Sequence, residues 1–342
     1  MPNVLFIRAD GSSTLGTGHV MRCLALAQSW VRGGGQVVWA LAETTPALNG
    51  RLRAEGFSCL SLAVAAGSPD DASSTIAHAR AAQAAWIVAD GYRFGSPWQK
   101  QVKAAGFRLL VVDDYGHAGH YHADLILNQN ASAPENLYNA REAATRLLLG
   151  APFVLLRQEF LTARPATRAI PAIARKILVT LGGSDPDNLT SRVIGALGQI
   201  SEMEVVVVVG GSNPHLDAVK RAVATCGFPC RLEINATNMP ELMAWADVAI
   251  SAAGSTAWEL AYMGLPSLLI VVAENQAGIA AALAREGVSQ NLGAGATLTA
   301  APVADALRAL LADQARRQTQ SRKGRNLVDG LGVDRVLTSL AA

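Results

Sequence analysis

The chain has 342 residues, of which half are hydrophobic and 16% are charged, and its formal net charge is +2. Such a length is typical of two domains, and the apolar content is enough to form two buried cores. Because the positive charges form no basic tract, the sequence gives no indication of a nucleic-acid partner or of an anionic membrane surface.

Targeting and redox features favour a cytosolic protein. A strand is expected within three residues of Met1, which leaves no room for a signal peptide, and no apolar run approaches the roughly 18 residues of a membrane span. The cysteines at positions 23, 59, 226 and 230 are scattered, without the spacing of a zinc site or of a disulfide framework. We therefore expect a cytoplasmic protein with no membrane insertion.

The most informative segment is a glycine-rich loop over residues 8–23. It follows an apolar run that predicts a buried strand, and it precedes apolar residues at helical spacing. His19 therefore falls in the first turn of a helix, where unpaired N–H groups and the helix dipole favour anions and a neutral imidazole. Close packing alone would also explain such glycines, but close packing does not require the polar side chains of Arg8, His19 and Arg22. A phosphorylated substrate beside a general base is the interpretation that we favour.

Two common nucleotide motifs do not fit this loop. Met21 stands where the dinucleotide fingerprint has its third glycine, and His19 stands where a P-loop lysine would be sought. Neither NAD nor ATP is therefore favoured, and no cofactor is expected.

The rest of the first half alternates between strands and helices. Strands are expected at residues 36–41, 59–62, 86–90, 109–112 and 124–128, and helices at 46–55, at 73–84 and after Pro97. This alternation predicts a parallel sheet, and ligands of such sheets bind beyond the carboxyl ends of the strands. Asp90 with Tyr92 and Asp113 with Asp114 follow two of these strands, so we expect them at the same edge as His19, although an aspartate after a strand is also an ordinary turn residue.

A second α/β unit is expected after a proline-containing connection at residues 164–171. Its expected strands are at residues 176–181, 205–209, 232–234, 247–251 and 266–272. Gly182, Gly183 and Ser184 follow the first of these strands, in the same layout of strand, glycine-rich turn and helix that opens the chain.

A second candidate binding loop follows strand 247–251. Ser255 or Thr256 can cap a helix there, and the free N–H groups of that helix can bind a diphosphate. Glu259 lies one turn into this helix and can accept hydrogen bonds from two ribose hydroxyls, although an exposed glutamate at a helix start is the alternative. Asn275 and Gln276 follow the next strand at the same edge.

A histidine-rich loop contains His117, His120 and His122. Their spacing is compatible with metal ligands, but no helix aligns them and turn residues surround them. A solvated loop is therefore favoured, and no metal site is expected.

Taken together, these segments resemble the UDP-2,4-diacetamido-2,4,6-trideoxy-β-L-altropyranose hydrolases of pseudaminic acid biosynthesis. The resembling residues are 8–10, 16–22, 90–92, 113–114, 181–185, 251–259 and 275–276, in the expected order over most of the chain. That family has an α/β architecture of the GT-B type, in which two Rossmann-like domains with parallel sheets face each other across a cleft. It is similar to the glycosyltransferase that adds N-acetylglucosamine to lipid-linked peptidoglycan precursors.

The resemblance implies a division of labour between two domains. Residues 1–160 would hold the sugar and the catalytic histidine, and residues 161–342 would hold UDP, with the active site in the cleft. The last helix, about residues 333–340, would pack back on the first domain as in related folds.

The resemblance also implies roles for individual residues. His19 would activate water, Tyr92 and Asn275 would position the water or the sugar, and Asp10 would lie close to the same centre. The implied substrate-binding residues are Gly16, Gly18, Arg22, Asp90, Asp113, Gly182, Gly183, Ser184, Ser255, Thr256, Glu259 and Gln276. The family hydrolyses the anomeric C–O bond with inversion and without a metal. An alanine-rich segment over residues 63–85 departs from the pattern, which concerns the exact sugar more than the reaction.

Two other functions stay open. A GT-B glycosyltransferase would pass the sugar to an acceptor instead of water, although the sequence shows no basic or apolar surface helix that would dock a lipid acceptor. A non-catalytic protein would bind the nucleotide sugar without turnover, although the polar residues at several strand ends argue against it. Incubation of the sugar nucleotide without an acceptor separates these functions from hydrolysis.

Overall fold

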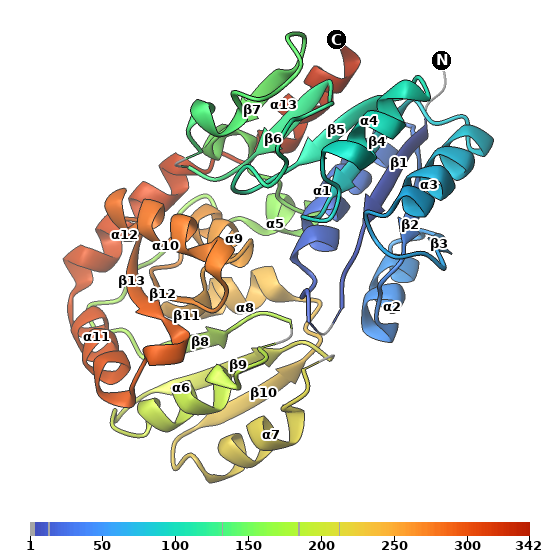
Figure 1. Cartoon of the computed structure of the whole chain (residues 1–342). Helices are drawn as coiled ribbons and strands as arrows, with labels where there is room; N and C mark the ends of the chain where they lie inside the picture. Colours follow the sequence, from blue (N-terminus) through green and yellow to red (C-terminus); the bar gives the residue numbers. More distant parts are fainter. Residues whose placement is uncertain (1–3, 13, 132, 184, 212) are drawn as a thin grey trace. The chain divides into compact units, whose positions relative to one another are not determined.

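The computed structural model describes residues 4–12, 14–131, 133–183, 185–211 and 213–342 (Figure 1). The chain divides into two compact units. Unit 1 comprises Met1–Gln158 and Gly330–Ala342, and unit 2 comprises Glu159–Asp329. Within the described ranges, no helix combines the length and the apolar character that crossing a membrane requires.

Unit 1 contains a seven-stranded parallel sheet in the order β3-β2-β1-β4-β5-β6-β7. Its strands are β1 (Val4–Ala9), β2 (Gln36–Leu41), β3 (Cys59–Ser61), β4 (Trp86–Asp90), β5 (Arg108–Val112), β6 (Leu125–Asn128) and β7 (Arg146–Leu149). The central strands are continuous apolar runs because helices cover both faces of the sheet. Strand β7 was not predicted from the sequence.

Two helical layers cover this sheet. The elements are α1 (Gly18–Arg32), α2 (Pro46–Ala54), α3 (Pro69–Ala81), α4 (Ser96–Ala104), α13 (Gly332–Ala341) and the 3₁₀ turns η1 (Glu135–Tyr138) and η2 (Ala151–Phe153). Successive residues of β1 face opposite layers: Leu5 and Ile7 share a core with α1, α2 and α13, whereas Phe6 shares a core with α3 and α4.

Helix α13 completes the core of unit 1 from the far end of the chain. Val333, Val336 and Leu340 are buried in the same cluster as helix α1. In addition, the indole N–H of Trp86 in β4 donates to the backbone carbonyl of Leu340 at 3.0 Å. The last helix is therefore part of the unit that the first residues begin.

Unit 2 contains a six-stranded parallel sheet in the order β10-β9-β8-β11-β12-β13. Its strands are β8 (Lys176–Thr180), β9 (Glu204–Val209), β10 (Cys230–Ile234), β11 (Val248–Ala252), β12 (Ser267–Val271) and β13 (Ser289–Ala294). Its helices are α6 (Leu189–Leu197), α7 (Leu216–Thr225), α8 (Met239–Trp245), α9 (Thr256–Met263), α10 (Ala277–Arg285), α11 (Ala300–Ala312) and α12 (Gln314–Leu327), with 3₁₀ turns η3 (Glu274–Gln276) and η4 (Gly295–Thr297). Helix α5 (Gln158–Ala163) spans the connection from unit 1. The expected pair of parallel, Rossmann-like domains is thus confirmed.

Each sheet reverses its strand order at one point. In unit 1 this point lies between β1 and β4, where Ala9 pairs with Asp90 at the carboxyl ends. In unit 2 it lies between β8 and β11, where Thr180 pairs with Ser251. Ligands of open parallel sheets bind at such switch points, because the flanking loops diverge there and leave a crevice.

A fully buried ion pair fixes β1 against α3. The Nε and Nη2 atoms of Arg8 donate to the two carboxylate oxygens of Asp71, both at 2.9 Å. Both side chains are inaccessible to solvent, and Nη1 of Arg8 donates to Asp10 at 2.6 Å. Burial opposes the charge of Arg8, but its bonds to Asp71 and Asp10 outweigh that cost and raise the pKa of the guanidinium.

We expect Asp71→Ala to destabilise unit 1 by about 3–5 kcal/mol, because it leaves the buried Arg8 with only part of its counter-charge. Urea unfolding followed by far-UV circular dichroism measures this loss. The control is Asp70→Ala, which removes the neighbouring but exposed carboxylate and should change stability by less than about 0.5 kcal/mol. Equal effects of the two substitutions would show that the ion pair contributes nothing specific.

Candidate active site

His19 is the second residue of helix α1 and points at the end of strand β4. Its Nδ1 atom lies 2.7 Å from Oδ1 of Asp90, the last residue of that strand. The Asp90 side chain is fully buried and that of His19 is 12% exposed. Because a carboxylate can only accept, Nδ1 carries the proton in this bond, so in the neutral form of the imidazole Nε2 holds the free electron pair. Within the described residues, no hydrogen-bond donor occupies Nε2.

Arg22, one turn further along α1, ties two carboxylates together. Its Nε and Nη2 atoms donate to the two oxygens of Asp90 at 2.6 and 2.7 Å, and its Nη1 donates to Asp114 at 2.7 Å. Burial acts to raise the pKa of Asp90, but the charge of Arg22 and the hydrogen bonds from Arg22 and His19 outweigh it and hold that pKa well below the ordinary value. Burial likewise opposes the charge of Arg22, yet Asp114 and Asp90 raise its pKa well above the ordinary value. Asp90 therefore stays ionised and fixes the orientation of the imidazole.

Tyr92 reaches the same network from the loop after β4. Its hydroxyl donates to Oδ2 of Asp114 at 2.7 Å, and its ring lies edge-on to that of His19 with centroids 4.9 Å apart. Asn130 also donates to Asp114, at 3.2 Å. The structure thus brings together His19, Arg22, Asp90 and Tyr92, as the shared strand edge led us to expect. Asp114 joins them, although our prediction named its neighbour Asp113 as the ligand.

Asp113 has a different position, inside its own loop. It accepts hydrogen bonds from the backbone N–H groups of Asp114 and Gly116, from Nδ1 of His117 at 2.8 Å and from the hydroxyl of Tyr121 at 2.6 Å. Burial acts to raise its pKa, but the bonds from His117 and Tyr121 hold that pKa well below the ordinary value. Asp113 shapes the loop that presents Asp114, and its contact with a substrate stays a prediction.

Asp10 also lies beside β1 but binds other groups. Its Oδ1 atom accepts from Arg8 at 2.6 Å and from the backbone N–H groups of Ala42 and Glu43 at 2.7 and 3.0 Å. In the part of the chain that the structure describes, no hydrogen bond joins these groups to His19. Asp10 therefore holds the loop after β2 in place beside the switch point.

The glycine-rich loop before α1 folds on itself. Gly16 has φ +75°, a conformation that favours glycine, and exchanges backbone hydrogen bonds with Ser12 at 3.2 and 2.9 Å. Thr17 precedes Gly18, the first residue of α1, and its side chain makes no capping bond. The described first turn contains no acidic residue, so no carboxylate within that turn compensates the partial positive charge of this helix end.

In unit 2, the loop after β8 brings backbone groups close together. Gly182 has φ +93°, and a Cβ on Gly210 would lie only 2.4 Å from the carbonyl oxygen of Gly183. Asp185 then caps α6 by accepting from the backbone N–H groups of Leu189 and Thr190. Ser184, which we expected to bind substrate, lies outside the described residues.

The second binding loop of unit 2 begins helix α9. Ser255 occupies the N-cap and Thr256 the first helical position, but the Ser255 side chain makes no capping hydrogen bond. The side-chain cap expected from the sequence is therefore not formed. Glu259 lies in the first turn and is 9% exposed, so it is largely buried at the switch point.

Gln276 and Asn275 lie in the 3₁₀ turn η3 after strand β12. The side-chain oxygen of Gln276 accepts from the backbone N–H of Val272 at 3.1 Å, which anchors the turn. A Cβ on Gly254 would lie 3.4 Å from Nε2 of Gln276, so the loops after β11 and β12 approach each other closely. The residues expected to hold a nucleotide thus gather at one edge of the second sheet.

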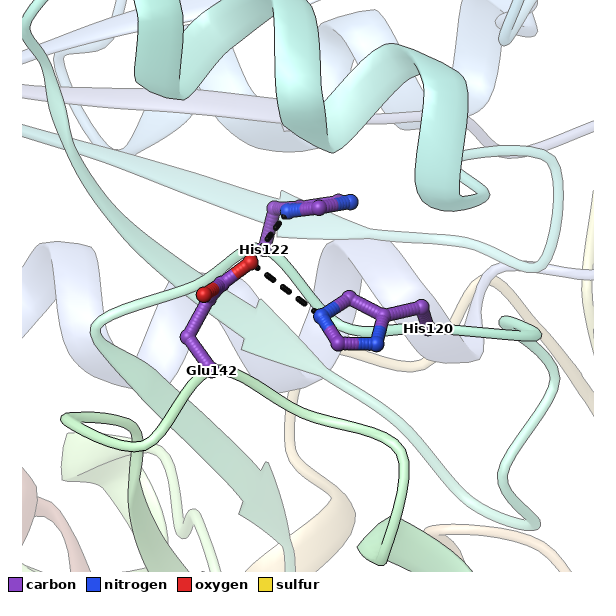
Figure 2. A group of neighbouring side chains, drawn as sticks. All are labelled: His120, His122 and Glu142. Atoms are coloured by element: carbon purple, nitrogen blue, oxygen red, sulfur yellow. Dashed lines mark hydrogen bonds and ion pairs between the residues drawn. The ribbon is translucent and has the colours of Figure 1, made fainter.

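The three histidines of the loop after β5 separate into two groups. His117 is buried against Asp113, whereas His120 and His122 lie beside Glu142 (Figure 2). Within the described residues, His120, His122 and Glu142 form the candidate metal-ligand cluster. Glu142 was not among the residues singled out from the sequence, because it is distant in the chain and lies in no recognisable motif.

Known proteins show related sequences and a related fold. A model of the glycosyltransferase family 28 C-terminal domain matches residues 176–330. The chain is 32% identical over 200 residues to the spore coat polysaccharide biosynthesis protein SpsG of Bacillus subtilis, covering 57% of this chain and 58% of SpsG. It is 26% identical over 286 residues to the UDP-2,4-diacetamido-2,4,6-trideoxy-β-L-altropyranose hydrolase of Campylobacter jejuni, covering 83% of this chain and 97% of the relative. The match thus spans little more than half the length of SpsG.

Among solved structures, MurG of Acinetobacter baumannii matches with a TM-score of 0.68 at 17% sequence identity, over 99% of both chains. The fold is therefore of the GT-B type, as the sequence resemblance implied.

We expect acid to destabilise unit 1 through Asp90 and Asp113. A carboxyl whose pKa is depressed on folding stabilises the fold above its unfolded value of about 3.9 and loses that contribution as the pH falls through the folded value. Thermal unfolding between about pH 7 and pH 3 should show this loss below about pH 4.

Asp113→Asn tests whether the Asp113 carboxylate contributes to this acid dependence. It should lower the unfolding temperature at neutral pH by roughly 4–8 °C, for a loss of about 2 kcal/mol, and flatten the dependence on acid. The exposed Asp70→Asn serves as the control and should follow the wild type. An Asp113→Asn protein with the wild-type acid dependence would contradict the role of this carboxylate.

Proposed function

We propose that the protein hydrolyses a UDP-linked diacetamido-trideoxyhexose, UDP-2,4-diacetamido-2,4,6-trideoxy-β-L-altropyranose, and releases UDP and the free sugar for pseudaminic acid synthesis. The hydrogen bond from His19 to Asp90 carries this proposal, because it leaves Nε2 as a base at the switch point of unit 1. The activity for which the Campylobacter jejuni relative is named supports the choice of substrate, and the match covers 97% of that relative.

In this reaction His19 acts on water. Nε2 accepts a proton from the water, whose oxygen attacks the anomeric carbon on the face opposite UDP. The bond from that carbon to the bridging oxygen breaks, and its electron pair leaves with the terminal phosphate of UDP, so the configuration at the anomeric carbon inverts. The ionised Asp90 stabilises the imidazolium that forms, as a buried carboxylate does in other acid–base pairs.

Unit 2 binds the UDP portion in this proposal. The N–H groups at the start of α9 are well suited to a diphosphate, because the Ser255 side chain does not cap them, and they compensate the negative charge that grows on the leaving oxygen. The first N–H groups of α6 already donate to Asp185. Gly182 and Gly183 have no side chain and let the phosphates approach the backbone, and Thr256 offers a backbone N–H at the first position of α9. Glu259 accepts hydrogen bonds from the ribose hydroxyls, and its burial keeps the carboxylate in one place.

The remaining residues position the substrate. Tyr92, held by Asp114, aligns the water or the sugar beside His19. Asn275 contributes an amide for the same purpose, and Gln276 fixes the turn that carries it. Asp10 acts by holding the loop after β2. The cytoplasmic location that the sequence predicts is part of this proposal.

A GT-B glycosyltransferase is the second candidate, and the match to the family 28 C-terminal domain favours it. The same base would then deprotonate an acceptor hydroxyl in place of water. UDP release from the sugar nucleotide without any acceptor identifies the hydrolase, whereas release that depends on an added acceptor identifies the transferase.

His19→Ala should reduce the turnover number for UDP release by about 10²- to 10⁴-fold, because it removes the general base. A coupled assay for UDP without added acceptor measures the rate, and circular dichroism confirms that the fold is retained. His78→Ala, an exposed histidine on α3, is the matched control and should keep full activity. Unchanged turnover in His19→Ala would remove His19 from the mechanism.

Glu259→Ala should weaken UDP binding by about 10- to 100-fold, because two hydrogen bonds to a charged group are lost. Calorimetric titration with UDP measures the affinity. Glu241→Ala removes an exposed glutamate from the first turn of α8 and should bind UDP as the wild type does. If both variants bind UDP equally well, Glu259 does not hold the ribose.

A further inference from the structure

The loop after β5 is joined to the segment before β7 by a short backbone bridge. Tyr121 pairs in parallel with Arg141. The backbone N–H of Tyr121 donates to Ala140 at 2.9 Å, and the N–H of Glu142 donates to Tyr121 at 3.1 Å. These bonds form an isolated bridge outside β6 and β7 and set the two segments in a fixed register.

This register decides where the side chains on either side of Tyr121 go. Tyr121 is 1% exposed, and its hydroxyl points inward to Asp113. Because neighbouring residues of an extended segment point to opposite faces, His120 and His122 project away from that core. Figure 2 shows both imidazoles directed at the carboxylate of Glu142.

The three side chains converge on a small volume. Nδ1 of His122 lies 2.7 Å and Nε2 of His120 lies 3.1 Å from the same oxygen of Glu142. The possible ligand atoms of the three residues all lie within 4.8 Å of one another. A tetrahedral metal ion with bonds of about 2.0–2.2 Å requires ligand atoms about 3.4 Å apart, so small side-chain rotations would suffice.

We propose that His120, His122 and Glu142 form a binding site for a divalent transition-metal ion of the Zn²⁺ type. Two imidazole nitrogens and one carboxylate oxygen are a donor set that suits Zn²⁺, and such a set disfavours Mg²⁺ and Ca²⁺, which prefer oxygen ligands. The side chains of His120 and Glu142 are 40% and 53% exposed, so solvent reaches the cluster and water can complete the coordination.

The cation in this proposal is a clamp, not part of the proposed hydrolysis. It joins the loop of His120 and His122 to the segment before β7 through side chains, in addition to the backbone bridge. The same loop begins with Asp113 and Asp114, and Tyr121 links its middle to Asp113. Metal binding therefore stabilises the loop that presents Asp114 to Arg22. The metal ligands themselves are distant in the sequence from His19, the proposed base.

The test is Zn²⁺ binding by the full chain without a histidine tag, after treatment with a chelator and dialysis. Competition with a chromophoric chelator gives stoichiometry and affinity. The wild type should bind one Zn²⁺ at this site, and His120→Ala and Glu142→Ala should each weaken that binding at least about 10-fold. Millimolar Mg²⁺ should not compete.

Matched controls separate this site from other zinc ligands. His78→Ala and His215→Ala remove histidines outside the cluster and should leave the affinity unchanged. Cys226→Ser tests the two free thiols of Cys226 and Cys230 as zinc ligands and should also leave the affinity unchanged. The proposal is overturned if the wild type binds no Zn²⁺ below millimolar concentration, or if His120→Ala and Glu142→Ala bind it within about threefold of the wild type.

Thermal unfolding gives a readout that does not depend on activity. Excess Zn²⁺ should raise the unfolding temperature of the wild type and of the controls, since a ligand that binds only the folded state stabilises it. It should have no such effect on the double variant His120→Ala/His122→Ala. Since the replaced side chains are at the surface, the metal-free variants should unfold at the wild-type temperature, and an equal zinc response in the double variant would contradict the clamp.

Discussion

The buried carboxylate of Asp90 is the group on which the candidate active site depends. A negative charge without solvent requires compensation, and here it is supplied by the two-point bond from Arg22 and by the bond from His19. The same requirement fixes the rotamers of both partners, so the geometry of the base follows from the electrostatics of the core. The network reaches Tyr92 through Asp114, which means that one guanidinium on α1 connects the end of β4 with the loops after β4 and β5.

Topology explains why these groups meet. Asp90 is the register neighbour of Ala9, and the chain departs in opposite directions from β1 and β4, so the loops after these strands diverge around His19. Unit 2 repeats the arrangement with β8 and β11. The two units use the shared architecture differently: ionic side chains dominate the switch point of unit 1, whereas glycine backbone and helix ends dominate that of unit 2.

The sequence was sufficient to predict the central strands, because buried parallel strands are continuous apolar runs, and the residues at their ends followed from the shared edge. It did not reveal β7 or β13, whose short or polar segments at sheet edges have no such signal. Helix α3 begins at Pro69, not at residue 73, because the Ser68 hydroxyl accepts the N–H of Asp71 and caps it there. Which of Asp113 and Asp114 binds Arg22 depends on the direction of each side chain, and two adjacent acidic residues in a sequence do not indicate that direction. Glu142 lies beside two histidines only because a backbone bridge joins two segments that are distant in the sequence.

The return of the chain to unit 1 has a consequence for biosynthesis. Because Gly330–Ala342 belongs to unit 1, unit 2 is an insertion within it, and the chain passes between the units twice. Val333, Val336 and Leu340 emerge from the ribosome after unit 2, yet they belong to the core that Leu5 and Ile7 begin. Unit 2 can therefore complete its fold while unit 1 still exposes the apolar surface that α13 will cover. For this chain the usual order of domain folding during translation, from the N-terminus onward, is reversed at the final step.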